Sequence, residues 1–298
     1  MYFETFQHHA WAGAAFDGGG RFAVISWRAG RAHPRVLDKF SFRGSFGLGR
    51  RGAINAVGVT RRGAVVAAVD AQVDGGRSRG YAWTRAGHRY TLAGPRAAFA
   101  IVPMAVTRND HILGYAATGR RHRPSYTVLR WNTIRSRPHV LFRIRAGATA
   151  PIAEQRGDVV WIDRRAHTRA HLFDGQQYRL LDDRGWDTVP WVAQGHYVWT
   201  DVGVQKWNLA RLPTSGPIVS QQVIPARPGV TTVPQAASLR GDVTYGGDLR
   251  HVRFANGTVR RLPREYTANG PEEETFTPAG TLAYTGRDRL IHLFRCRF

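Results

Sequence analysis

The most regular feature of the chain is an alternation of apolar and polar positions that restarts after each tight polar turn. The clearest example is Arg156-Gly157-Asp158, followed by the segment Val159-Val160-Trp161-Ile162-Asp163. Such alternation predicts a half-buried β-strand, because successive side chains of a strand point to opposite faces of the sheet. Similar turn-and-strand units begin at seven anchor residues: Gly20, Gly63, Asp110, Gly157, Gly195, Gly241 and Gly280.

The anchors recur at a nearly constant interval of 38 to 47 residues. A period of about 43 residues is typical of four-stranded propeller blades. A further strand precedes several anchors, at residues 54–60, 104–107, 151–154 and 190–193, and prolines stand at or near its start. A third strand is expected to carry a large aromatic residue near its end: Trp83, Trp131, Phe173, Trp207, Phe254 and Phe294. We therefore expect an all-β fold, a seven-bladed β-propeller of four-stranded blades in a single domain spanning residues 1–298.

The last repeat is short, because only 18 residues follow Gly280. These residues suffice for two strands but not for a third. The segment Tyr2-Phe3-Glu4-Thr5-Phe6 alternates like a strand, and it lies before the first repeat. We expect it to complete the last blade as its outer strand and so to close the ring, which would cover an otherwise open sheet edge.

The turn and strand of the last repeat, Thr277-Pro278-Ala279-Gly280-Thr281-Leu282-Ala283-Tyr284, resemble the WD-repeat-like blades of bacterial β-propellers such as the Tol translocation protein. The resemblance extends over the whole chain at the level of the repeat. It implies a seven-bladed ring used mainly for binding, and it implies no catalytic residue. The Trp-Asp and Gly-His signatures of true WD repeats are not kept in each repeat, so a scaffold role is not carried over.

The chain is strongly basic, with 43 Lys and Arg against 21 Asp and Glu and a formal net charge of +22. Such a charge favours anionic partners: a small anion, a polyanion or an acidic protein surface. Nucleic acid belongs to this class, but the sequence does not favour it over the other members. Only Lys39 and Lys206 are lysines, so a high-GC coding bias toward arginine codons is an alternative source of part of the charge.

The cysteine count and the absence of long apolar runs exclude several classes of protein. The single cysteine, Cys296, excludes an internal disulfide and a cysteine-based metal cluster within one chain. We expect no metal, no cofactor and a monomer. No apolar run approaches the ~18 residues of a membrane span, and no signal-peptide pattern is visible. The compartment stays open, and it would be extracytoplasmic if the chain is already processed.

In a propeller, the loops that join the second and third strands of each blade share one face with the connections between blades. Arginines gather in these loops in three adjacent repeats, and two tryptophans lie near the connection after the fourth. The predicted ligand-binding residues are Arg77, Arg79, Arg120, Arg121, Arg123, Arg164, Arg165, Trp186 and Trp191. Forked guanidinium groups bind phosphate, sulfate or carboxylate at two points, and indole rings stack on planar groups. Plain solvated charge and aromatic packing are the alternatives.

The same loops also open with aspartates, among them Asp163 and Asp201. These carboxylates could serve as acid and base in a glycosidase or lyase. The alternative is structural, since Asp initiates β-turns by accepting backbone N–H bonds. His167 and His171 are four residues apart, but that spacing aligns metal ligands only on a helix. We expect a non-catalytic binding propeller that recognises an anionic ligand or acidic partner, with the enzyme as the alternative hypothesis.

Overall fold

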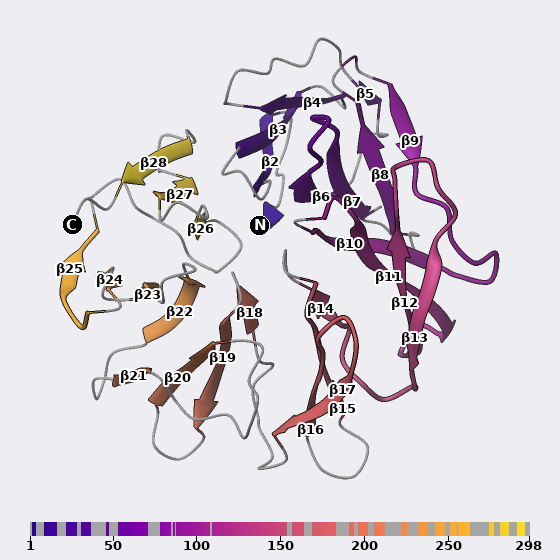
Figure 1. Ribbon diagram of the computed structural model, residues 1–298. Helices are drawn as coiled ribbons and strands as arrows, with labels where there is room; N and C mark the ends of the chain where they lie inside the picture. The colour runs from indigo at the N-terminus through magenta and orange to yellow at the C-terminus, as the bar shows by residue number, and fades with distance from the viewer. Residues whose placement is uncertain are drawn as a thin grey trace. The chain divides into compact units, whose positions relative to one another are not determined.

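A computed structural model describes the backbone of twenty-three segments of the chain. They are residues 2–3, 9–16, 22–28, 31–36, 46–47, 53–70, 78–84, 86, 88–107, 109–153, 157–163, 169–182, 191–193, 196–201, 206–211, 222–225, 232–237, 242–247, 251–254, 256–262, 274–276, 281–285 and 291–295. Every regular element among them is a β-strand, and every strand pair is antiparallel (Figure 1). The expectation of an all-β fold is confirmed. The chain divides into two compact units, Met1–Gly147 and Ala148–Phe298.

The first unit holds three sheets, each built mainly from strands that follow one another in the chain. The first is β2-β3-β4-β5, the second is β1-β6-β7-β8-β9 and the third is β10-β11-β12-β13. Their bounds are β1 Tyr2–Phe3, β2 His9–Phe16, β3 Phe22–Arg28, β4 Arg31–Val36, β5 Phe46–Gly47, β6 Ala53–Val59, β7 Val65–Asp70, β8 Arg79–Trp83, β9 Arg89–Thr91, β10 Ala100–Val106, β11 Ile112–Arg120, β12 Arg123–Trp131 and β13 His139–Ile144.

The second unit holds the remaining four sheets: β14 to β17, β18 to β21, β22 to β25, and β26 to β28. Their bounds are β14 Ile152–Ala153, β15 Val159–Asp163, β16 Arg169–Phe173, β17 Tyr178–Asp182, β18 Trp191–Ala193, β19 His196–Asp201, β20 Lys206–Arg211, β21 Gln222–Pro225, β22 Thr232–Ala237, β23 Val243–Gly247, β24 His251–Arg253, β25 Val259–Arg261, β26 Glu274–Phe276, β27 Thr281–Thr285 and β28 Ile291–Arg295.

Three of the anchor residues, Gly63, Asp110 and Gly157, lie in the turn between the first and second strands of a repeat. Gly63, Asp110 and Gly157 have φ values of +78°, +67° and +104°, in the left-handed region that glycine adopts at little cost. Thr60 and Thr107 close two of these turns, since each hydroxyl accepts a hydrogen bond from the amide four residues later, at 3.0 and 3.1 Å. The tight turns predicted at these three anchors are thus confirmed, and the other four anchors lie outside the described residues.

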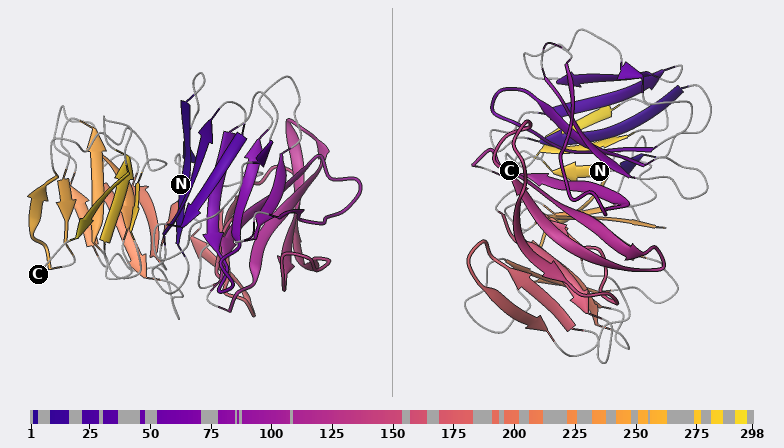
Figure 2. Two further views of the ribbon diagram at one scale, coloured as in Figure 1. Left: turned by 90° about the horizontal axis from the view of Figure 1, so that it is seen from above. Right: turned by 90° about the vertical axis from the view of Figure 1, so that its right-hand side faces the viewer.

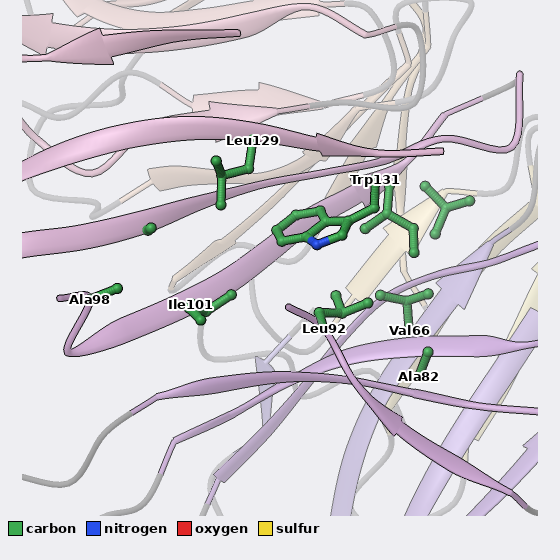
Figure 3. Close-up of a cluster of buried hydrophobic side chains, with 10 residues drawn as sticks. Val66, Ala82, Leu92, Ala98, Ile101, Leu129 and Trp131 are labelled. Carbon is green, nitrogen blue, oxygen red and sulfur yellow. The ribbon is translucent and has the colours of Figure 1, made fainter. Parts of the chain in front are cut away.

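A hydrophobic core lies between the sheets β6–β9 and β10–β13 of the first unit. Its centre is Trp131, which is fully buried and donates from its indole Nε1 to the carbonyl oxygen of Ala93 at 2.8 Å. Its neighbours come from both sheets and from the connection between them: Val66, Ala82, Leu92, Ala98, Ile101, Val106, Ile112, Ala116 and Leu129 (Figure 3). The other face of β11 and β12 also carries buried side chains, among them Leu113 and Val128. Each face of this sheet therefore needs a covering layer.

The predicted aromatic residue of the third strand is buried wherever the structure describes its side chain. Trp83 and Trp131 end their strands at full burial, and Phe173 and Phe254 are also in the core. Trp207 differs, because it is the second residue of β20 and pairs with Thr200, so it lies near the start of that strand. The repeat is therefore less regular in the second unit than its aromatic spacing indicates.

Proline marks a bulge in the first strand of two sheets. The register of β10 shifts between Pro103 and Ala105, and that of β22 shifts between Pro234 and Ala236. These prolines therefore lie inside their strands, and not at the start as the sequence indicated. A bulge leaves a residue outside the hydrogen-bonded ladder, so a residue without an N–H is tolerated beside it.

The predicted closure by the N-terminal strand is wrong. The structure pairs Tyr2 with Asn55 and Phe3 with Ile54, so β1 lies along β6 of the second sheet, and not beside β28. The reason is local. Few residues separate β1 from β2, and β2 packs against β6, so β1 lies close to the free edge of β6.

Candidate functional site

The candidate site is centred on the hairpin that joins β11 to β12. Arg120 pairs directly with Arg123, and Arg121 and His122 form the turn between them. All four side chains are exposed. Like charges directly opposite each other destabilise an antiparallel pair. The sequence thus places three guanidinium groups and an imidazole on the tip of one hairpin, at a cost to its stability.

The neighbouring connection between β9 and β10 packs beside this hairpin. The amide of Phe99 donates to the carbonyl of Ala117 at 3.0 Å, and the guanidinium carbon of Arg121 lies 5.9 Å from the centre of the Phe99 ring. Contact with the face of the ring favours the cation and orients it. Arg96, in the same connection, is exposed. The connection therefore adds a fourth arginine and a platform for Arg121.

Arg79 begins β8 at the same end of its sheet. Ile101 connects this end of β8 to the third sheet. Its amide donates to the carbonyl oxygen of Ser78 at 3.0 Å, and it pairs with Ala116 in β11. The side chain of Arg79 lies on the opposite face of β8 from Ala82, which faces the core shared with the third sheet. Its guanidinium Nη1 is buried and donates to no acceptor within the described part of the chain. A buried donor of this kind calls for an acceptor.

The other five predicted ligand-binding residues remain predictions. Arg77, Arg164, Arg165 and Trp186 lie outside the described residues. Trp191 is the first residue of β18, where it pairs with Val198. The hypothesis of one arginine sector across three repeats therefore rests, within the described residues, on Arg79 and the β11–β12 hairpin.

The two candidate catalytic carboxylates occupy equivalent places in their hairpins. Asp163 ends β15 and pairs with Arg169, and Asp201 ends β19 and pairs with Lys206. Opposite charges directly across a strand pair are stabilising. The corresponding positions of the β11–β12 hairpin hold Arg120 and Arg123. The acidic member of the pair is therefore replaced by arginine in the third sheet.

The distribution of charge between the two units was missed in the sequence analysis, because it depends on where the chain divides. Residues 1–147 hold 24 basic and 6 acidic residues, whereas residues 148–298 hold 19 and 15. Between Asp110 and Glu154 there is no carboxylate side chain at all. A coding bias toward arginine raises the number of basic residues but does not remove acidic residues from one half. The positive field thus belongs mainly to the first unit.

The first sheet of this unit repeats the like-charge arrangement, since Arg28 pairs with Arg31 across the turn between β3 and β4. In both hairpins a two-residue turn separates the arginines. Arg28 and Arg31 are therefore further candidates. The signal that identifies them is the residue pairing between β3 and β4, which sequence spacing alone does not give.

The opposite end of the third sheet carries the only acidic side chain between residues 75 and 153, Asp110. Its Oδ1 accepts from the amide of Arg61 at 2.7 Å, in the equivalent turn of the second sheet. Next to it, partial burial lowers the pKa of His111, the charge of Arg130 lowers it further, and Asp110 opposes the shift. At this end a hydrogen bond therefore joins the turns of two sheets. It lies about 30 Å from Arg120 along β11.

The described residues contain no group of three His, Cys, Asp or Glu side chains placed to hold a metal ion. Where the structure describes the chain, no helix is long and apolar enough to cross a membrane. The side chains gathered at the candidate site are mainly arginines, which form charge-assisted, two-point hydrogen bonds to oxyanions.

No protein-family model matches the chain, and no curated protein sequence is similar to it. Solved structures are similar in fold. The β-propeller domain of Cps50 (Swd1) from Myceliophteria thermophila has a TM-score of 0.59 at 11% identity, over 99% of both chains. A streptogramin B lyase has a TM-score of 0.56 at 12% identity, over 98% of both chains. A prolyl endopeptidase reaches 0.63 at 11% identity, and the chain spans half of its length.

These likenesses confirm the resemblance to WD-repeat-like propellers at the level of fold. TolB of Acinetobacter baumannii is also similar, at a TM-score of 0.48, so the fold assignment rests on the three structures above. At identities of 11 to 12% they carry over no ligand and no activity. The fold is that of a β-propeller-type repeat protein.

Proposed function

We propose that this protein is a non-catalytic binding propeller that holds an anionic ligand at the β11–β12 hairpin. The observation that carries the proposal is the direct pairing of Arg120 with Arg123, with Arg121 and His122 exposed between them. Repulsion among these groups lowers the stability of the free hairpin, and an oxyanion bound between them would remove that repulsion. At the equivalent places of two other hairpins Asp163 pairs with Arg169 and Asp201 with Lys206, so like charges are not a requirement of such a hairpin.

Two further features support an external anion as the partner. The stretch between Asp110 and Glu154 contains no carboxylate side chain. The buried Nη1 of Arg79 lies at the same end of the sheets and, within the described residues, has no acceptor. Removing an acceptor from a buried charged donor costs more than an average hydrogen bond contributes. Both features favour a ligand that brings its own negative charge.

We further infer that the chain forms one seven-bladed propeller in a single domain, whose blades are the seven sheets. The buried apolar residues on both faces of the sheet β10–β13 support this arrangement, because a sheet within a ring is covered on both sides. The likeness to the β-propeller domain of Cps50 (Swd1) over 99% of the chain is consistent with it. Closure does not use the N-terminal strand, since β1 pairs with β6.

The catalytic alternative would assign Asp163 and Asp201 to an active site, and the strand pairing of these residues offers a structural role instead. Asp163 and Asp201 each pair with a basic residue across a hairpin, which the stability of the hairpin explains. A glycosidase would need two carboxylates facing one bond at about 5 to 10 Å. The two aspartates stand at equivalent places in different sheets.

The test compares binding of inorganic polyphosphate by the native protein, by Arg120→Gln/Arg123→Gln, and by Arg62→Gln/Arg137→Gln. The control pair removes the same charge from exposed positions in turns at the opposite end of the sheets. Titration calorimetry at low salt should show an affinity loss of more than tenfold for the hairpin pair, and of less than about threefold for the control pair. Equal losses in both variants, or no binding by the native protein, would refute the proposed site.

A further inference from the structure

The β11–β12 hairpin extends beyond the sheet to which it belongs. Its inner neighbour β10 last pairs at Ala100 with Ala117, and its outer neighbour β13 last pairs at Ile144 with Tyr126. Three further pairs continue past these points: Thr118 with Ser125, Gly119 with Pro124, and Arg120 with Arg123. We call this segment, residues 118–125, the ribbon. β11 and β12, which form it, are nine residues long each, the longest strands in the described part of the chain (Figure 2).

The ribbon projects by about 10 Å, since each residue of an antiparallel strand advances about 3.4 Å. Its neck is slim, because Gly119 has no side chain and a Cβ at that position would meet nothing within 4 Å. Its tip is wide and cationic, with Arg120, Arg121 and Arg123 exposed. A two-stranded ribbon with a narrow neck and a charged tip is suited to insertion into a groove, and less suited to a flat surface.

The major groove of B-form DNA is about 12 Å wide and about 8.5 Å deep, and it admits a two-stranded β-ribbon. The projection of the ribbon matches this depth. Arginine makes two hydrogen bonds to O6 and N7 of guanine in that groove, and it also binds phosphates. The major groove of A-form RNA is too narrow for side chains to read, and single strands offer no groove. The shape of the ribbon thus favours duplex DNA among polyanions.

The surroundings of the ribbon supply the positions that phosphates on the groove edges would occupy. Arg96 is exposed in the connection that packs beside the hairpin, and Arg121 is held against the ring of Phe99. Thr118 and Ser125 are half-exposed hydroxyl residues at the base of the ribbon. Arginine and hydroxyl side chains are the usual partners of DNA phosphates. The excess of basic residues in the first unit adds a field that attracts a polyanion from a distance.

Building on the proposed anion site, the geometry points to duplex DNA as its ligand, with residues 118–125 inserted into the major groove. The interaction places Arg120 and Arg123 on base edges and Arg96 and Arg121 on the flanking phosphates. Since arginine reads guanine, G·C-rich duplexes bind more tightly than A·T-rich ones of the same length.

The experiment measures the fluorescence anisotropy of a labelled 20-base-pair duplex, of the single strand, of an RNA duplex of the same sequence and of labelled heparin. It uses the full chain and a salt series. The native protein should bind duplex DNA at least tenfold more tightly than the other three probes. Arg120→Gln/Arg123→Gln should weaken duplex binding at least tenfold and remove the preference for G·C-rich over A·T-rich duplexes, whereas Arg62→Gln/Arg137→Gln should leave both preferences unchanged.

Ser125→Trp separates groove insertion from general attraction, because it widens the base of the ribbon and keeps every charge. This variant should weaken duplex DNA binding at least tenfold and leave polyphosphate affinity within about twofold. If Ser125→Trp binds the duplex as the native protein does, or if heparin, RNA and single strands bind equally well, the DNA inference is wrong while the anion site stands. If polyphosphate binding does not depend on Arg120 and Arg123, the proposed function itself fails.

Discussion

The Oδ1 atom of Asp110 accepts a hydrogen bond of 2.7 Å from the backbone amide of Arg61. The two residues lie in equivalent turns of adjacent sheets, one repeat apart. Asp110 stands where Gly63 and Gly157 stand in their own turns, and it keeps the same left-handed backbone at φ +67°. Aspartate tolerates this conformation better than most residues, so the position gains an inter-sheet hydrogen bond at small conformational cost.

Substitutions at Asp110 should separate these two roles. Asp110→Asn keeps an acceptor and the tolerance of positive φ, so it should lower the free energy of unfolding by less than about 0.5 kcal/mol. Asp110→Gly loses the acceptor, at about 1 kcal/mol. Asp110→Ala loses the acceptor and adds backbone strain, for about 2 to 3 kcal/mol in all. Urea unfolding measures the series, and an equal loss for Gly and Ala would contradict the role of backbone conformation.

Acid should destabilise the protein in part through His111. Partial burial lowers its pKa below the ordinary value of 6.5, and the charge of Arg130 lowers it further. The unfolded chain therefore binds the proton more readily, and this part of the stability is present above pH 6.5 and is lost as the pH falls through the lower folded pKa. Lowering the pH from 7.5 to 5 should lower the urea midpoint of the native protein. The same pH change should lower the midpoint of His111→Gln by less. A parallel pH dependence would show that His111 does not contribute.

Trp131 should be the most sensitive aromatic position of the first unit. Trp131→Phe removes the hydrogen bond to Ala93 and leaves a cavity among residues of two sheets, at a cost of about 1 to 3 kcal/mol. Trp161 is half-buried and stacks on His171, so Trp161→Phe should cost less than about 1 kcal/mol. Chemical denaturation of both variants checks the order, and a larger loss at Trp161 would contradict the position of the core.

Gly114 is fixed by the close approach of the bulged strand β10. A Cβ at this position would lie 2.5 Å from the carbonyl oxygen of Val102 and 2.9 Å from the Cα of Pro103, and backbone atoms cannot move aside as a side chain can. Gly114→Ala should therefore lower the free energy of unfolding by about 3 kcal/mol or more. Gly119→Ala has open space and only an unfavourable φ of +84°, so it should cost about 1 kcal/mol. Thermal unfolding of the two variants side by side is the measurement.

The fold followed from local signals that the sequence displays directly. The turns at Gly63, Asp110 and Gly157 and the burial of Trp83 and Trp131 depend on neighbouring residues and on strand alternation, so the pattern was sufficient to predict them. The pairing of β1 with β6 was not predictable in this way, because strand alternation says where a strand is but not which edge it joins.

The candidate site was likewise predictable only in part. The sequence identified Arg120, Arg121 and Arg123 from their density alone. The register of the strands decides that Arg120 pairs with Arg123 and that their hairpin extends past both neighbouring strands. The composition of a loop gives no information about this register. The contrast with Asp163 and Arg169 became visible only when equivalent pairs were aligned by their hydrogen bonds.

The order of the strands within the sheets has a consequence for how the chain folds. Apart from β1, every strand pairs with its immediate neighbour in sequence, so the closing loops are short and little chain entropy is lost for each contact formed. Each sheet can then nucleate by itself and grow by docking on the next, as stacked repeats do. The pairing of β1 with β6 spans more than fifty residues and must wait until the whole first sheet is in place. The N-terminal strand is therefore expected to be the last part of the first unit to become protected from hydrogen exchange.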